Sequence, residues 1–294
     1  MSNLHILPCI DSDEMAASRR RELEIPRNIA AALGRSAVKA GHDGVYLNRD
    51  GQEIVWRDAV RAACEAKRSI APGAELPRHV GTAFPETLVQ VTNETTLGAS
   101  RRLVERGLRP LALNFANGIH PGGGFLHGAR AQEETLCRCS ALFHTLVDDP
   151  MYEEHRKRPE ADSTDWSIYS PDVPVFRTDA GTELLRHWLL SFVTCAAPFA
   201  PDIGQPRAGD LLQRRIHRVL DIARAYGHTS LVLGAWGCGA FENDLNRTAA
   251  DFRRALENDY LGSFAEVVFA ISDWSPARQY LGPFRDTFAE LAGA

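Results

Sequence analysis

The chain has 294 residues, of which 44% are hydrophobic and 24% are charged, as is typical of a globular protein. This length fits two domains, or one large domain with extensions. The net charge of -5 argues against a broad nucleic-acid-binding surface, which is normally basic, although a local basic patch could still bind a polyanion.

Cysteine usage and the first residues indicate a cytoplasmic protein. The six cysteines include no pair with CxxC spacing and do not look like a disulfide framework in a chain this long. The start, MSNLHILPCIDSDE, lacks the basic residues and long apolar run of a signal peptide. No stretch approaches the roughly 20 apolar residues of a membrane span. We therefore expect reduced thiols, a cytoplasmic location and no membrane partner.

Residues 1–85 are predicted to form a mostly helical accessory region. The charged, alanine-rich stretch 14–40 indicates a helix that is broken near Pro26. GVYLNRDGQEIVW, at 44–56, is typical of two short strands joined by a turn. RDAVRAACEAKRSI then predicts another helix, which APGAELP ends.

Residues 86–294 have the pattern of a separate α/β domain. Strand-like runs lie at 87–92, 110–116, 173–178, 189–197, 230–236 and 266–271. Helices are predicted at 95–106, 132–147, 208–226 and 246–260, the second with a buried stripe of Leu136, Ser140, Phe143 and Val147. Apolar strands that alternate with helices indicate a sheet buried on both faces. The polar segment 148–172 is interpreted as a surface excursion.

A glycine run follows the predicted strand PLALNFA, within NFANGIHPGGGFLHGARAQEE at 114–134. Ligands of open α/β sheets bind beyond the carboxyl ends of strands. Gly122, Gly123 and Gly124 permit positive φ and let backbone N–H groups approach a phosphate. The helix that begins near Gln132 adds the positive end of its dipole. The sequence therefore predicts a phosphate-binding loop.

Two adjacent glutamates stand in the first turn of that helix. Glu133 and Glu134 lie about 100° apart around the helix axis, so one can hold hydroxyl groups while the other faces a reacting bond. Their repulsion and partial burial are expected to raise one pKa toward neutrality, as a general acid needs. The alternative is a glycine-rich turn with glutamates that only favour a helix N-terminus. That alternative explains Asn117, the three glycines and Gln132 together poorly.

The spacing of these residues resembles the GGG…QEE signature of poly(ADP-ribose) glycohydrolases. NFANGIHPGGGFLHGARAQEETLCRCSALF is similar to their smaller, microbial-type members, and the resemblance runs from about residue 15 to the C-terminus, including VTNETTLGASRRL and IYSPDVPVF. It implies a macrodomain-like fold, a three-layer α/β/α arrangement with a mixed central sheet, here with an N-terminal, mostly helical extension.

The resemblance also implies roles for residues of the first loop. Glu134 would be the catalytic residue and Glu133 would hold ribose hydroxyls. Asn117 would contact the distal ribose, and Gly122–Gly124 would line the diphosphate path. Gln132 is counted among the substrate-binding residues.

A second glycine loop, GAWGCGAFEND at 234–244, follows another apolar strand. It begins like a dinucleotide fingerprint, but Glu242 stands where GxGxxG needs its third glycine, and no P-loop motif occurs. In the family, the corresponding GxGxF loop closes over the diphosphate and its aromatic residue packs near the distal ribose. The resemblance thus assigns substrate binding to Gly237, Cys238, Gly239, Ala240 and Phe241. An ordinary core aromatic is an equally good account of Phe241 alone.

The remaining candidates are less specific. Thr95 is predicted to lie on the adenine side, and helix capping explains it equally well. The ten histidines form no HExxH motif, so no metal is expected, and the cysteines are interpreted as packing residues. No organic cofactor is required.

The expected reaction is hydrolysis of the ribose–ribose O-glycosidic bond of poly(ADP-ribose), from chain ends, with release of ADP-ribose. Two adjacent glutamates cannot easily straddle one bond. Protonated Glu134 would therefore donate to the leaving ribose oxygen and then activate water, while the substrate diphosphate stabilises positive charge. A mono-ADP-ribosyl hydrolase acting on ADP-ribosylated proteins stays open, as does a non-catalytic ADP-ribose-binding macrodomain. The latter has no need of Gln132-Glu133-Glu134.

Overall fold

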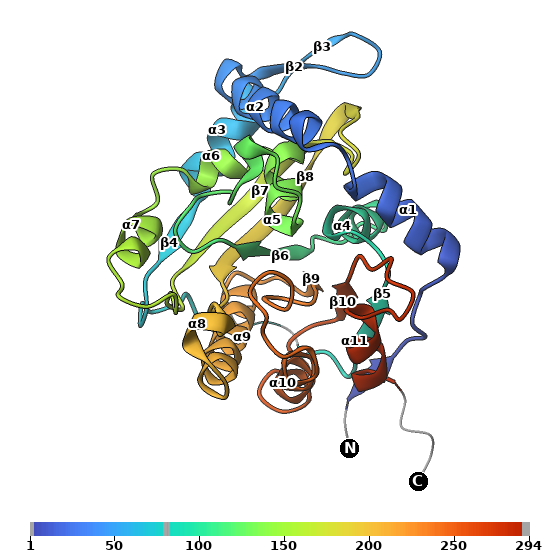
Figure 1. Cartoon of the computed structure of the whole chain (residues 1–294), viewed down its shortest axis with the longest axis vertical. Coiled ribbons are helices and arrows are strands. Elements are labelled where there is room, and N and C mark those ends of the chain that lie inside the picture. Colours follow the sequence, from blue (N-terminus) through green and yellow to red (C-terminus); the bar gives the residue numbers. More distant parts are fainter. Residues whose placement is uncertain (1–2, 79–80, 82, 290–294) are drawn as a thin grey trace.

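The computed structural model describes residues 3–78, 81 and 83–289, in which a mixed eight-stranded sheet lies between helices (Figure 1). The strand order is β1-β5-β10-β9-β6-β8-β7-β4. These strands are β1 (Leu4–Ile6), β4 (Arg68–Ile70), β5 (Thr87–Thr92), β6 (Leu111–Ala116), β7 (Ser167–Arg177), β8 (Glu183–Ala196), β9 (Ser230–Leu233) and β10 (Glu266–Ala270). A separate hairpin consists of β2 (Val45–Leu47) and β3 (Glu53–Val55).

The helices flank the sheet along the whole chain. They are α1 (Asp13–Leu23), α2 (Arg27–Asp43), α3 (Arg57–Ala66), α4 (Thr96–Glu105), the 3₁₀ helix η1 (Phe125–His127), α5 (Gln132–Cys139), α6 (Leu142–Leu146), α7 (Pro150–Arg156), α8 (Ala200–Ile203), α9 (Arg207–Ala225), α10 (Leu245–Glu257) and α11 (Leu281–Thr287). The predicted α/β class with a mixed central sheet is confirmed.

The pairing of the strands creates one edge at which several loops meet. β5, β10, β9, β6 and β8 are joined by parallel pairings, so their carboxyl ends point the same way. The edge strand β1 also pairs in parallel with β5, whereas β7 pairs antiparallel with β8 and β4. The loops after β5, β6, β9 and β10 therefore lie side by side, and they include both glycine loops.

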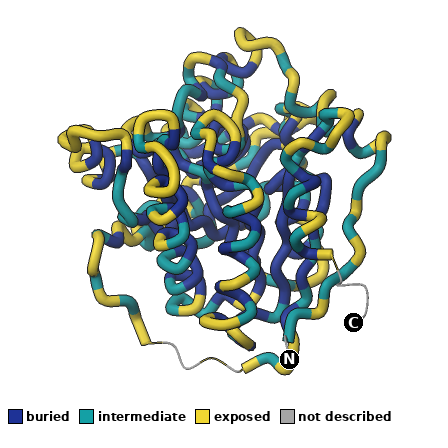
Figure 2. The backbone as a smooth tube through the Cα atoms, turned by 60° about the horizontal axis from the view of Figure 1, so that its bottom comes forward, coloured by how far each residue is buried: buried dark blue, intermediate teal, exposed yellow. Residues whose placement is uncertain are grey.

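The sheet separates two hydrophobic cores, as the alternation of side chains along a strand requires. In β6, Leu111 and Leu113 pack into one core and Ala112 into the other. In β10, Val267 and Val268 divide in the same way. Figure 2 shows the buried strands at the centre and exposed residues mainly on the outer helices and loops. Burial on both faces explains the nearly continuous apolar runs of the sequence.

The N-terminal elements follow their predicted pattern in α1 and α2 on either side of Pro26 and in the β2–β3 hairpin after them. The helix predicted over 57–70 is wrong at its end, because α3 ends at Ala66 and residues 68–70 form the strand β4, which pairs with β7. Two short strands of this region also join the main sheet, β1 beside β5 and β4 beside β7. The division into 1–85 and 86–294 stays a prediction. Its residues 1–2, 79–80, 82 and 290–294 lie outside the described residues.

The prediction of one continuous helix over 132–147 is wrong. α5 ends at Cys139, and Ser140 is extended, with φ -143°, and bridges to Val175. Its hydroxyl donates to the Leu136 carbonyl and accepts the Leu142 N–H. Serine side chains that bond nearby backbone groups in this way compete with helix continuation. Ser140 thus separates α5 from α6.

The interpretation of 148–172 as a surface excursion is also wrong in part. The segment contains α7, whose Tyr152 is buried, and the buried beginning of β7. Asp149 caps α7 and also accepts hydrogen bonds from Lys67 and Ser69. Several polar residues in this stretch are therefore buried. For this reason its hydrophobic periodicity does not reveal the helix and the strand.

Candidate active site

A cavity of about 460 Å³ opens where the carboxyl ends of β5, β10, β9 and β6 meet. Nine of the predicted site residues line it: Thr95, Asn117, Gln132, Glu133, Glu134, Gly237, Gly239, Ala240 and Phe241. Gly122, Gly123, Gly124 and Cys238 are not among its lining residues in the described chain. The fold therefore brings the two glycine loops and the glutamates to one cavity, as expected from their positions after strands.

Glu134 lines this cavity and is held at one oxygen only. Its Oε1 accepts the Gly124 N–H at 3.0 Å. Its Oε2 is buried and has no hydrogen-bond partner among the described residues. A buried carboxyl oxygen without a partner costs free energy, and such groups in folded proteins are often found at catalytic sites. Glu134 thus keeps one oxygen available for a ligand.

Glu133 is more deeply buried and is held at both oxygens. Its Oε2 accepts the Asn117 N–H at 2.7 Å, and its Oε1 lies 3.3 Å from the Asn114 Nδ2 donor. Burial, opposed by these hydrogen bonds and assisted by the charge of Glu134, raises the pKa of Glu133 to about 8. Glu133 therefore retains a proton at neutral pH. The prediction that one of the two pKa values is raised is confirmed for Glu133.

The glycine run packs directly against the two glutamates. Gly122 and Gly123 have φ of +70° and +57°, which side chains rarely adopt. A Cβ on Gly123 would collide with the Glu134 Oε1 and come within 3.1 Å of the Glu133 Oε2. Glycine is needed here because the backbone itself forms the wall beside the carboxylates.

Gln132 joins α5 to the neighbouring strand β6. Its Oε1 accepts the Phe115 N–H at 2.9 Å, and its Nε2 donates to the Leu113 carbonyl at 2.7 Å. A third bond runs from Nε2 to the Thr96 hydroxyl at the start of α4. These bonds fix the first turn of α5, which carries both glutamates, against the sheet.

Asn117 shapes the turn that leaves β6. Its Oδ1 accepts the N–H groups of Ile119 and His120, and its own N–H binds Glu133. The turn therefore starts from the same residue that holds the Glu133 carboxylate.

The second loop, 234–244, forms the facing part of the cavity. Gly237 has φ +75°, and the Asn243 side-chain amide donates to the Gly237 and Pro198 carbonyls. Phe241 lines the cavity and meets Phe199 edge to face, with ring centroids 5.7 Å apart. Phe241 thus lines the cavity and is also partly buried against the core on that side of the sheet.

Cys238 points away from this loop's cavity side. Its thiol contacts the Trp236 carbonyl and the Thr248 hydroxyl, and burial raises the pKa of Cys238 to about 12. A thiol with a raised pKa is a poor nucleophile, so we interpret Cys238 as a packing residue.

The family of this chain is shown by comparison with solved structures. The family described as "Microbial-type PARG, catalytic domain", where PARG is poly(ADP-ribose) glycohydrolase, matches residues 34–178. The chain is 38% identical to the PARG of Thermomonospora curvata, with a TM-score of 0.83 and coverage of 88% of this chain and 99% of that one. The chain belongs to the microbial-type PARG family. The predicted family and its macrodomain-like fold are confirmed.

Two ligand-bound PARG structures are also similar. The Thermomonospora curvata enzyme bound to the inhibitor ADP-HPD is 37% identical, with a TM-score of 0.81 over 88% of this chain and 99% of that chain. The PARG of Deinococcus radiodurans in complex with ADP-ribose is 40% identical, with a TM-score of 0.71 over 78% of this chain and 96% of that chain. No curated protein sequence matches the chain.

Sequence reasoning missed two polar residues that the PARG fold brings to the site. Asn114 is fully buried in β6 and places its amide between Glu133 and Thr194. Asp179 lines the cavity, and burial raises the pKa of Asp179 to about 6. A polar residue inside the apolar run PLALNFA was a signal for Asn114. No sequence pattern singled out Asp179.

Thr95 caps a helix and also lies at the cavity. Its hydroxyl oxygen accepts the Gly98 N–H and so caps α4, and it donates to the Asp179 carboxylate at 2.8 Å. Capping is therefore present in the structure, and Thr95 also lines the cavity.

A further wall of the cavity, formed by Ile271, Ser272, Trp274 and Tyr280, was not predicted. It belongs to the irregular segment after β10, which carries no motif. Across residues 3–78, 81 and 83–289, no three His, Cys, Asp or Glu side chains are grouped as a metal site requires. The described helices include none that is long and apolar enough to cross a bilayer.

Proposed function

We propose that this chain hydrolyses the ribose–ribose O-glycosidic bond of poly(ADP-ribose) from chain ends and releases ADP-ribose. The observation that carries the proposal is the state of Glu134, fixed through one oxygen by the Gly124 N–H and left with a second, unpartnered oxygen beside the cavity. A carboxyl held in this way can deliver a proton to a leaving oxygen with little reorganisation.

Proton transfer through Glu134 accounts for both halves of the reaction. As the bond to the anomeric carbon breaks, Glu134 protonates the ribose oxygen of the leaving chain. The positive charge that develops at the anomeric carbon is stabilised by the anionic diphosphate of the substrate. Water then adds to that carbon and gives its proton to Glu134, which restores the acid. Neither step calls on a metal or an organic cofactor.

The raised pKa of Glu133 keeps a proton next to Glu134 at neutral pH. Burial raises the pKa of Glu133 to about 8, whereas the free Oε2 belongs to its neighbour Glu134. In our account Glu133 also holds the ribose hydroxyls.

For the other site residues we propose the roles that the family resemblance implies. We assign the distal ribose to Asn117 and Phe241, the diphosphate to the backbone of the two glycine loops, and the adenine side to Thr95. The two loops offer glycines with positive φ, Gly122, Gly123 and Gly237, where N–H groups can approach an anion.

The proposed ligands are poly(ADP-ribose), ADP-ribose and ADP-ribosylated proteins that carry the polymer. Solved relatives are described in complex with ADP-ribose and with the inhibitor ADP-HPD. We propose the cytoplasm as the compartment, which is supported by six cysteines that form no disulfide.

Product analysis separates this function from its alternatives. The purified protein is incubated with poly(ADP-ribose) of defined length and, separately, with a mono-ADP-ribosylated protein, and the products are resolved by anion exchange. We expect ADP-ribose to accumulate while the polymer shortens gradually. Release of long oligomers would contradict cleavage from chain ends. Binding of ADP-ribose without turnover of either substrate would identify a non-catalytic ADP-ribose-binding macrodomain. Turnover of the mono-ADP-ribosylated protein alone would identify a mono-ADP-ribosyl hydrolase.

A further inference from the structure

The segment 272–280 after β10 is built as a rigid wall of the cavity. Ser272, Trp274 and Tyr280 line the cavity. Between them, the buried Asp273 carboxylate accepts both the N–H and the hydroxyl of Ser275 through Oδ1, and the Tyr280 N–H through Oδ2. One carboxylate therefore closes the loop on itself.

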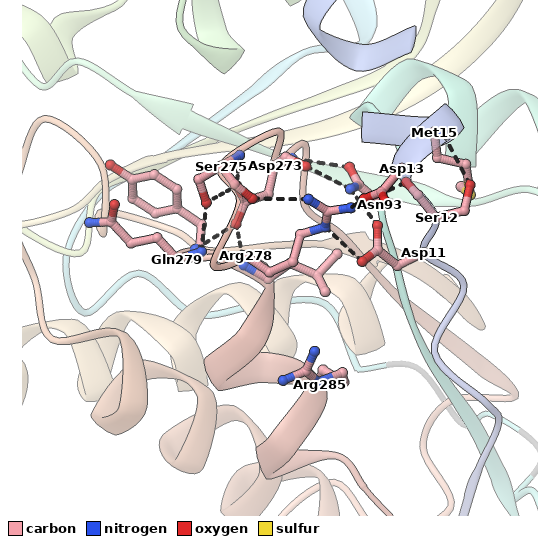
Figure 3. Close-up of polar contacts among 12 residues, drawn as sticks. Asp11, Ser12, Asp13, Met15, Asn93, Asp273, Ser275, Arg278, Gln279 and Arg285 are labelled. Atoms are coloured by element: carbon pink, nitrogen blue, oxygen red, sulfur yellow. Dashed lines mark hydrogen bonds and ion pairs between the residues drawn. The ribbon is translucent and has the colours of Figure 1, made fainter. Parts of the chain in front are cut away.

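Arg278 ties this wall to the N-terminal segment of the chain (Figure 3). Its side chain is only 12% exposed. Its Nε donates to the Asp11 carboxylate at 2.7 Å, and its Nη2 donates to the Asp13 carboxylate at 2.9 Å. The same guanidinium bonds the Ser12 carbonyl and, within the wall, the Ser275 carbonyl. A guanidinium with charge-assisted bonds to two segments holds both in a defined geometry.

Asn93, directly after β5, also joins the N-terminal segment to the wall. Its Nδ2 donates to the Asp11 carboxylate at 2.8 Å and to the Asp273 carbonyl at 2.7 Å, and its Oδ1 accepts the Asp273 N–H. Asp11 thus lies between Asn93 and Arg278, which Figure 3 shows as a continuous chain of contacts.

The N-terminal segment also contributes to the cavity itself. Leu23, at the end of α1, lines the cavity, as does Trp274 of the wall. Segments 11–24 and 272–280 are therefore joined through Arg278, and each contributes side chains to the cavity.

This wall lies away from the glutamates. In the sheet, β10 is separated from β6, the strand that anchors Glu133, by β9 alone, so the two strands lie about 10 Å apart. If the bond is cut at Glu134, as proposed, the wall faces a more remote part of the bound ligand. Contacts to remote parts of a substrate set its affinity and orientation.

We propose that Arg278, through Asp11 and Asp13, is a positioning residue that fixes this wall and so sets the affinity of the cavity for its ligand. Arg278 acts through Ser272, Trp274 and Tyr280 and does not meet the reacting atoms. The inference rests on the proposed function for the identity of the ligand.

The test compares Arg278→Gln, Asp11→Asn and Arg278→Lys with the wild type. For each protein, the dissociation constant for ADP-ribose is measured by calorimetry. KM and kcat are measured on poly(ADP-ribose), and the melting temperature is also determined. We expect Arg278→Gln to raise Kd and KM about tenfold, or about 1.4 kcal/mol, with kcat within about twofold of wild type. Asp11→Asn should change them in the same direction, and Arg278→Lys should recover part of the loss.

Arg61→Gln is the matched control, because Arg61 forms only exposed ion pairs on α3. Unchanged Kd and KM in both Arg278→Gln and Asp11→Asn would overturn the proposal, as would a loss of kcat and melting temperature at constant KM. If Arg278→Gln does not fold, the Kd and KM of Asp11→Asn decide whether the proposal stands. A wild type that binds ADP-ribose but does not cut the polymer refutes the proposed function, while the Kd comparison still tests Arg278.

Discussion

Gly123 leaves no room for a side chain beside the Glu133 and Glu134 carboxyls. A Cβ at this position would collide with the Glu134 Oε1. We expect Gly123→Ala to lower kcat at least about 100-fold, because displacement of a catalytic group by about 1 Å has this effect. Steady-state kinetics on poly(ADP-ribose) checks the prediction.

Gly51→Ala is the control that separates collision from backbone strain. Gly51 has φ +76°, similar to the +57° of Gly123, but has nothing within 4 Å of an added Cβ. Both variants should lose about 1–2 kcal/mol of stability through strain. If Gly123→Ala keeps a kcat within a few-fold of wild type, the close packing of the glycine run against the glutamates is not needed for activity.

Glu133 is expected to make the stability of the protein fall as the pH rises. Burial raises its pKa from 4.5 to about 8 in the folded state, so the folded chain binds a proton that the unfolded chain has released between these values. The stabilisation is complete below pH 4.5 and is lost by about pH 8, with a slope of at most about 1.4 kcal/mol per pH unit.

Denaturant unfolding of wild type and Glu133→Gln from pH 5 to 8 measures this effect. The difference in unfolding free energy between the two should change across the range, in favour of Glu133→Gln as the pH rises. Parallel curves would show that Glu133 has an ordinary pKa in the folded protein.

At the scale of residues, the sequence identified groups with a local signature and missed those defined by proximity. Glu133, Glu134 and the glycines stand within one stretch of the chain, so their spacing was enough. Asp179 reaches the site only through a later loop. Asn114 stands in the same stretch as the glutamates, but its contact with Glu133 depends on how α5 packs against β6. The sequence also predicted that one glutamate has a raised pKa, but burial decides that it is Glu133.

At the scale of elements, the junction between α5 and β6 controls where the glutamates stand. Gln132 donates to or accepts from Leu113, Phe115 and Thr96. Gln132→Ala leaves the Phe115 N–H and the Leu113 carbonyl without these bonds. We expect a loss of about 1–3 kcal/mol in unfolding free energy and a kcat about tenfold lower. Denaturant unfolding and kinetics on the same samples measure both.

Gln213→Ala provides the comparison on another helix. Gln213, on α9, donates one longer bond, of 3.3 Å, to Asp251 and lies outside the cavity lining. Its loss should leave kcat unchanged and cost less than about 1 kcal/mol. Equal effects of the two substitutions would show that the α5–β6 junction has no special role.

The limits of element prediction lie where side chains override a local pattern. Periodicity located most helices and the long buried strands. It joined α5 to α6, because the hydrogen bonds of Ser140 cannot be read from its place in an apolar stripe. Periodicity also failed to predict α7 and the start of β7. The polar Asp149 at the start of α7 is buried and accepts hydrogen bonds from Lys67 and Ser69.

At the scale of the molecule, the central sheet joins segments from the whole chain. β1 and β4 come from the first 85 residues and lie at opposite ends of the sheet order. Each has three residues, too few for a pattern, and their pairing with β5 and β7 depends on distant parts of the chain. The matched family region, 34–178, extends across residue 85. Our proposed accessory region is thus connected to the catalytic sheet at both edges.

The central claim is that the cavity cuts poly(ADP-ribose) with Glu134 as the proton donor. The most direct measurement is the rate of ADP-ribose release from poly(ADP-ribose) by wild type and Glu134→Gln, with the exposed Glu65→Gln as control. We predict rapid release by wild type and Glu65→Gln, and a rate at least about 10³-fold lower for Glu134→Gln, whose Kd for ADP-ribose stays within about threefold of wild type. Wild-type rates in Glu134→Gln, or no release by any of the three proteins, would contradict the claim.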